Sequence, residues 1–169
     1  MIRHAHAAPQ TAATPDAERP LTMEGEQRFR AAARGLAQRV TPDVLLTSPL
    51  LRARQTAAIA SAAWGGLAPT PDGALALGGV EGILATLENQ PRDATVAIIG
   101  HEPTVSMLVA QLTGAASSES FAFEPGAAAL LELSSIARRS GRLLWVMTPP
   151  DVTAPGGVGG RRGLPPTSS

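Results

Sequence analysis

Ala94-Thr95-Val96-Ala97-Ile98-Ile99, followed at once by Gly100-His101-Glu102-Pro103, is the stretch that decides the fold. A continuous apolar run of this kind, with no alternating polar residues, is typical of a strand buried on both faces of a sheet. The run stops at Gly100-His101. Pro103 then opens a helix to about Leu112, because proline is well tolerated in a first turn. The sequence therefore predicts a buried strand, a short turn and a helix.

The same pattern occurs upstream. Asp43-Val44-Leu45-Leu46 is a short apolar run that stops at Thr47-Ser48-Pro49, and a helix is predicted from Leu50 to Ala63, where Gly65-Gly66 follows. The remaining predicted elements are a helix over 22–40 with Thr22 as its N-cap, a loop over 68–79, a helix over 80–89, and strands over 127–133 and 142–147.

Alternating strands and helices predict an α/β fold, a three-layer αβα sandwich with a mostly parallel central sheet. The first strand is expected to be truncated, because only Met1 and Ile2 precede Arg3 where about five residues would be usual. Either translation starts further upstream or this strand is short. If the gene encodes upstream apolar residues, we expect that adding them would raise the melting temperature of the protein. Residues 1–148 are predicted to form one domain, followed by a disordered Pro/Gly-rich tail at 149–169.

Composition excludes several classes of function. The 14 basic residues, all arginine, balance 14 acidic ones, so no net charge favours nucleic acid or an anionic membrane. The chain has no cysteine, which excludes disulfides, thiolate metal sites and a cysteine nucleophile. It also has no apolar run of about 18 residues. We expect a cytoplasmic protein without a membrane segment.

Three motifs follow predicted strands: Arg3-His4-Ala5-His6, Ser48-Pro49-Leu50-Leu51-Arg52 and Gly100-His101-Glu102-Pro103. Because ligands of open α/β sheets bind outside the carboxyl ends of the strands, these residues are predicted to converge. Two arginines and two histidines in one pocket repel each other unless an anion lies between them. Phosphate fits, because arginine binds its oxygens bidentately.

Together with Asp16, Arg19-Pro20-Leu21-Thr22 and Gly25, and with the continuation Ala53-Arg54-Gln55-Thr56, these motifs resemble the histidine phosphatase superfamily (phosphoglycerate mutase-like). More narrowly, they are similar to the SixA-type phosphohistidine phosphatases. The resemblance extends in order from Arg3 to about Leu112. It implies that His4 is the nucleophile and that Arg3, Arg52 and His101 complete the phosphate pocket, with His4 neutral, His101 protonated, and no metal or cofactor.

The segment from 68 to 89 offers only Asp72, Glu81 and Glu88 as the acid that ester-cleaving relatives use to protonate an alkoxide leaving group, and none of them matches. Imidazole leaves readily without such an acid. The preferred substrate is therefore phosphohistidine in a phosphorylated protein. Glu102 or a loop carboxylate remains a second source of the proton.

Other interpretations stay open. Ser48 is predicted either to bind substrate or to form the turn. His6 is predicted to lie at the pocket rim or to pair with His4 at a metal, since alternate residues of a strand share a face. Arg19 is predicted to shape its loop or to reach the substrate. Arg54 is expected to be a surface residue. The competing functions are a phosphatase for a small phosphate ester, a phosphate-binding scaffold without turnover and, last, a metal protein.

Overall fold

The computed structural model describes residues 1–136 and 141–149, so the predicted tail lies outside the described residues from 150 onward. Six strands of the described part form one sheet in the order β3-β2-β4-β1-β5-β6. The strands β3, β2, β4 and β1 pair in parallel, whereas β5 is antiparallel to β1 and β6 to β5. The strands are β1 Ile2–Arg3, β2 Val44–Thr47, β3 Pro69–Pro71, β4 Val96–Gly100, β5 Ala128–Leu133 and β6 Gly141–Met147.

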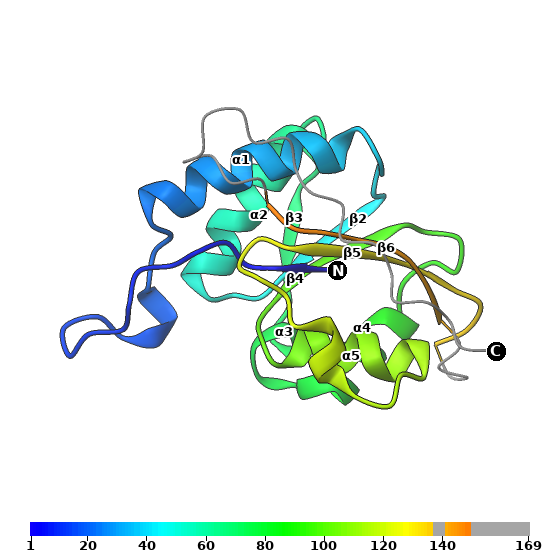
Figure 1. Cartoon of the computed structure of the whole chain (residues 1–169). Helices are drawn as coiled ribbons and strands as arrows, with labels where there is room; N and C mark the ends of the chain where they lie inside the picture. Colours follow the sequence, from blue (N-terminus) through cyan, green and yellow to red (C-terminus); the bar gives the residue numbers. More distant parts are fainter. Residues whose placement is uncertain (137–140, 150–169) are drawn as a thin grey trace.

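Helices cover both faces of this sheet (Figure 1). On one face lie α1 (Met23–Ala37) and α2 (Leu51–Ala63), and on the other α3 (Ala74–Leu77), α4 (Gly79–Glu88) and α5 (Thr104–Thr113). Two 3-10 helices, η1 (Asp16–Glu18) and η2 (Ser118–Phe121), lie in connecting segments. The predicted three-layer α/β fold with a mostly parallel sheet is confirmed.

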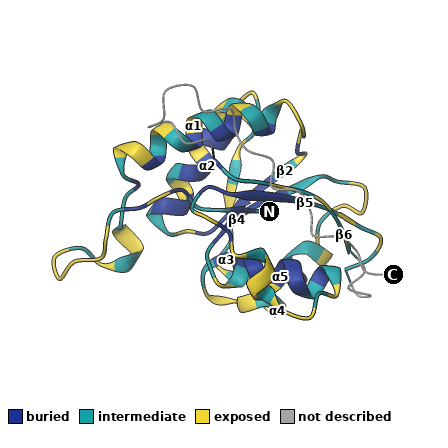
Figure 2. Ribbon diagram, in the orientation of Figure 1, coloured by how far each residue is buried: buried dark blue, intermediate teal, exposed yellow. Residues whose placement is uncertain are grey.

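The central strands divide the core between the two helical layers. Leu45 and Ile99 are buried in the cluster that contains the apolar residues of α1 and α2, whereas their neighbours Leu46 and Ile98 are buried in the cluster with α4 and α5. Successive side chains of a strand point to opposite faces. This is why the predicted strands read as unbroken apolar runs, and Figure 2 shows burial concentrated in the sheet and on the inner sides of the helices.

The prediction of a loop over 68–79 is wrong, because the chain forms β3 and α3 there. Pro69 pairs in register with Leu45 and Pro71 with Thr47 at the edge of the sheet. An edge strand tolerates proline at positions where the backbone N–H would point away from the neighbouring strand. Asp72 precedes α3, and its carboxylate accepts a hydrogen bond from the backbone N of Ala74, the first residue of that helix, at 2.8 Å.

The helix predicted over 22–40 begins as expected and ends early. The hydroxyl of Thr22 accepts a hydrogen bond from the backbone N of Gly25 at 2.9 Å, which confirms the N-cap, and α1 ends at Ala37. No helix in the described part of the chain is long and apolar enough to cross a membrane.

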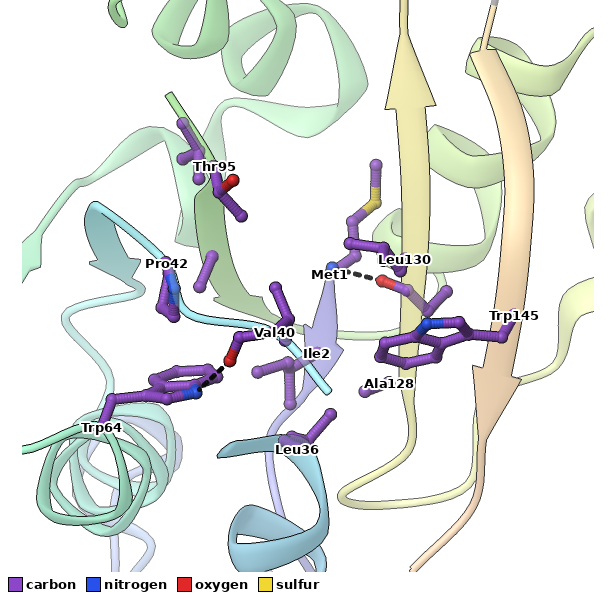
Figure 3. Close-up of a pocket in the computed structure, with 13 residues that line it drawn as sticks. Met1, Ile2, Leu36, Val40, Pro42, Trp64, Thr95, Ala128, Leu130 and Trp145 are labelled. Carbon is purple, nitrogen blue, oxygen red and sulfur yellow. Dashed lines mark hydrogen bonds between the residues drawn. The ribbon is translucent and has the colours of Figure 1, made fainter. Parts of the chain in front are cut away.

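The first strand is short, as expected, and lies inside the sheet. Ile2 pairs with Ile99 of β4 and with Ala128 of β5. The Met1 amine donates to the carbonyl of Ala129 at 2.7 Å, and burial lowers its pKa to about 5. A small apolar cavity lies at this end of β1, with Trp64 and Trp145 on two of its sides (Figure 3). This cavity lies at the amino ends of the parallel strands, whereas His4 lies at their carboxyl ends.

Candidate active site

The three motifs meet at the carboxyl ends of the parallel strands. His4 follows β1, Ser48 follows β2 and His101 follows β4, which lies between those two strands. The backbone N of His4 donates to the carbonyl of Gly100, and that of Ser48 donates to the carbonyl of Ile99, both at 3.0 Å. These bonds hold the three strand ends side by side, so the predicted convergence is observed.

Both ring nitrogens of His4 have a hydrogen-bond partner. Its Nδ1 lies 2.7 Å from the backbone carbonyl of Ala5. A carbonyl can only accept, so Nδ1 carries the proton and Nε2 keeps its lone pair. The Nε of Arg52 donates to this Nε2 at 3.3 Å. His4 is therefore held as the neutral tautomer that a nucleophilic imidazole requires.

Both pocket histidines have pKa values well below the ordinary 6.5. Burial lowers the pKa of His4 to about 3, helped by the charges of Arg52 and Arg3, although the hydrogen bond to Ala5 opposes this effect. Burial also lowers the pKa of His101 to about 4, helped mainly by Arg52. Burial and the charges of Arg52 and Arg3 disfavour a proton on His101, whereas a bound phosphoryl group would favour one, so the protonated His101 of the transition state stays a prediction.

Asp16 forms two hydrogen bonds with Arg52, a contact that the sequence did not predict. The side chain of Arg52 is 8% exposed, and its NH1 donates to the backbone carbonyl of Asp16 at 2.7 Å while its NH2 donates to the Asp16 carboxylate at 3.1 Å. Behind it, Thr56 donates to the backbone carbonyl of Arg52 at 2.7 Å and accepts from the backbone N of Ala5 at 3.0 Å. The spacing of four residues places Thr56 on the same helix face as Arg52.

Ser48 serves the turn and the pocket together. Its hydroxyl lies 2.7 Å from Nε2 of His101 and accepts a hydrogen bond from the backbone N of Leu50 at 3.3 Å. The turn interpretation agrees with the bond from Leu50, whereas contact of this fully buried serine with substrate stays a prediction. His101 Nδ1 is buried and has no hydrogen-bond partner within residues 1–136 and 141–149.

Arg3 is held by the segment that follows η2. Its NH1 donates to the carbonyl of Phe123 at 2.5 Å, and the charge of Glu102 opposes the lowering of the Arg3 pKa by burial. Glu102 accepts from the hydroxyl of Ser106 at 2.7 Å and from the backbone N of Phe123 at 3.3 Å. These bonds tie the Glu102 carboxylate to the scaffold.

His6 and Arg19 lie on the loop that walls the pocket. His6 is exposed, and its Nδ1 lies 3.1 Å from the hydroxyl of Thr22. Arg19 donates to the carbonyl of Ala8 and to the carboxylate of Asp16, both at 2.8 Å. Both contacts of Arg19 stay within the loop. Arg54 is exposed, as expected.

The three carboxylates of the segment from 68 to 89 have other partners or positions. Asp72 lies beside the pocket edge, since its backbone N donates to the carbonyl of Thr47, but its carboxylate accepts from Ala74 at 2.8 Å and from Thr86 at 2.9 Å. Glu81 accepts from Gln111 at 3.0 Å. Glu88 is exposed on the last turn of α4.

Comparisons with known proteins found one matching family model and several similar structures. Residues 1–76 match the model of the histidine phosphatase superfamily (branch 1). A solved structure of the protein histidine phosphatase SixA complexed with tungstate is 31% identical, with a TM-score of 0.74 over 88% of this chain and 94% of that one. A Nakamurella multipartita protein assigned as phosphohistidine phosphatase SixA is 29% identical, with a TM-score of 0.74 over 88% of this chain and 93% of that one.

A curated relative, an uncharacterized protein of Picosynechococcus sp., is 41% identical over 108 residues. The match covers 60% of this chain and spans 64% of the length of that relative.

Proposed function

The chain belongs to the histidine phosphatase superfamily, and we propose that it hydrolyses phosphohistidine in a protein through a phosphohistidine intermediate on His4. The observation that carries this proposal is the neutral His4, whose Nε2 lone pair lies beside Arg52 in a pocket shared with His101 and Ser48. An imidazole nitrogen held in this way is a nucleophile for phosphorus. A solved SixA structure was determined with tungstate, a tetrahedral oxyanion, and this supports an oxyanion as a ligand of the present chain.

The proposed reaction has two displacements. Nε2 of His4 attacks phosphorus, the bond from phosphorus to the substrate imidazole breaks, and the imidazole leaves with a proton taken from solvent. Water then attacks the phosphorus bound to Nε2, that P–N bond breaks, and phosphate is released while the proton of the water passes to solvent. Arg3, Arg52 and His101 stabilise the charge on the equatorial oxygens, and Ser48 orients His101.

The positions of the carboxylates support phosphohistidine as substrate. Arg19 and Arg52 hold the pKa of Asp16 below its usual range, so that side chain is ionised and cannot give a proton to an alkoxide. Glu102 is tied to Ser106 and Phe123. A leaving imidazole does not require an enzyme acid, whereas an alkyl ester does.

The loop over residues 5–21 is short where it contacts Arg52 through Asp16, and this supports a phosphorylated protein as partner. His6 and Arg19 on the rim are the side chains proposed to contact it. We place this activity in the cytoplasm, which fits the absence of cysteine.

A leaving-group series tests the substrate class. Initial rates of phosphate release are measured on a phosphohistidine peptide, on para-nitrophenyl phosphate, whose phenolate needs no acid, and on glycerol phosphate, whose alkoxide does. The proposal predicts that glycerol phosphate is hydrolysed at least about 10²-fold more slowly than the other two, the usual contribution of a general acid. An equal rate on glycerol phosphate would show that an acid is present and that an ester is an equally good substrate.

A further inference from the structure

We propose that Asp16 is a positioning residue: it orients Arg52 for phosphoryl transfer, and its negative charge weakens the binding of phosphate in the ground state. The inference rests on the proposed function only in that phosphorus is attacked in this pocket, and it does not depend on the leaving group.

Asp16 holds one guanidinium by two different atoms. Its backbone carbonyl accepts from NH1 of Arg52 at 2.7 Å, and its carboxylate accepts from NH2 at 3.1 Å. The remaining nitrogen, Nε, donates to Nε2 of His4. All three nitrogens of the guanidinium therefore have a defined partner, and the plane of Arg52 is fixed relative to the nucleophile.

Asp16 is itself held from the loop side. Its second carboxylate oxygen accepts from NH1 of Arg19 at 2.8 Å, and Nε of Arg19 donates to the carbonyl of Ala8. The carboxylate side chain is 45% exposed, whereas that of Arg52 is 8% exposed. The carboxylate thus lies at the boundary between solvent and the buried guanidinium, where it connects the loop to the pocket.

The charge of Asp16 and its hydrogen bonds act on different states of the reaction. An ionised carboxylate beside the pocket repels a phosphate dianion, and its influence extends to His101. A guanidinium fixed in one plane stabilises the transition state more than a mobile one does, because no reorganisation is needed when the charge moves. Replacing the carboxylate by an amide of the same shape should therefore tighten phosphate binding while slowing the chemical step, so that KM and kcat fall together.

Asp43 offers a matched control. Its carboxylate also accepts a hydrogen bond, from the backbone N of Thr95 at 2.8 Å. Asp43 precedes β2, however, so it lies at the amino ends of the strands and away from the pocket. Asp16→Asn and Asp43→Asn remove the same charge by the same isosteric change. We would measure kcat and KM with para-nitrophenyl phosphate, the dissociation constant of inorganic phosphate, and the melting temperature.

The expected result for Asp16→Asn is a fall in kcat of about tenfold to a hundredfold, as for a misplaced catalytic group, with severalfold tighter binding of phosphate. Asp43→Asn should leave both values unchanged. An unchanged kcat, or weaker phosphate binding with a lower melting temperature, would overturn the inference, the latter because Asp16 would then only shape the loop.

In an active wild type the outcomes stay separate from those for the proposed function. If the wild type hydrolyses the aryl ester but not phosphohistidine, the proposed substrate is wrong and Asp16 is still tested in full. If the wild type hydrolyses neither substrate, the proposed function and the positioning role of Asp16 in phosphoryl transfer are both overturned, whatever the phosphate affinity of Asp16→Asn.

Discussion

The imidazole rings of His4 and His101 lie with their centroids 5.0 Å apart and their planes inclined by 56°. Both rings are partly buried, and both share the pocket with Arg52. The site is thus built with its cations on the arginines and its histidines neutral. This arrangement leaves His4 ready to attack and makes protonation of either ring costly to the fold.

The pH dependence of stability follows from these two rings. Their pKa values fall from the ordinary 6.5 to about 3 for His4 and about 4 for His101, so between these limits the unfolded chain binds more protons than the folded one. This contribution to stability is complete above about pH 6.5 and is lost as the pH falls toward 4 for His101 and toward 3 for His4. We expect melting temperatures to fall over this range, and to fall less steeply in His101→Asn. The same substitution at the exposed His6 is the control, and equal slopes for all three proteins would contradict the neutral pocket.

The guanidinium geometry of Arg52 should not be replaceable by an ammonium group. Lysine keeps the charge but cannot contact Asp16 and His4 together from a planar group with three nitrogens. Arg52→Lys should lower kcat by about 10²-fold, as expected for loss of a transition-state hydrogen-bond donor. Arg54→Lys, on the same helix but exposed, should have wild-type kinetics. Activity of Arg52→Lys within a few fold of wild type would argue against a role in charge stabilisation.

Gly25 should be required for the approach of α1 to the loop after β1. A Cβ at this position would overlap the backbone carbonyl oxygen of His6, two residues from the nucleophile. Gly25→Ala is expected to cost about 1–3 kcal/mol of unfolding free energy, as overpacking does, and to lower kcat by shifting His4. In Gly82→Ala the new Cβ would meet that of Ala74 at an ordinary 3.5 Å, so this helical position is the control. Denaturant titration and kinetics compare the two, and equal stabilities would be the contrary result.

The fold was largely predictable, because the strands at the centre of the sheet bury both faces and so read as apolar runs such as 94–99. The strand β3 was missed, since three residues that include two prolines resemble a loop unless the neighbouring strand is known. The pairing of β3 depends on its contact with β2 in the folded protein, which the local sequence does not show.

The site was predictable where a residue follows a strand end, as His4, Ser48 and His101 do. Asp16 gave no such signal, because its contact with Arg52 joins residues 36 positions apart and depends on the path of an exposed loop. The charge state of His101 could not be read from its neighbours in sequence either, since burial and Arg52 set its pKa.

The central claim is that His4 takes the phosphoryl group from phosphohistidine. The most direct measurement follows phosphate release from a phosphohistidine protein and from para-nitrophenyl phosphate by wild type and by His4→Ala, with vanadate and EDTA added separately. We predict release from phosphohistidine that vanadate inhibits, that EDTA does not change, and that His4→Ala abolishes. Release by His4→Ala at the wild-type rate, or no release by a wild-type protein that still binds phosphate, would contradict the account.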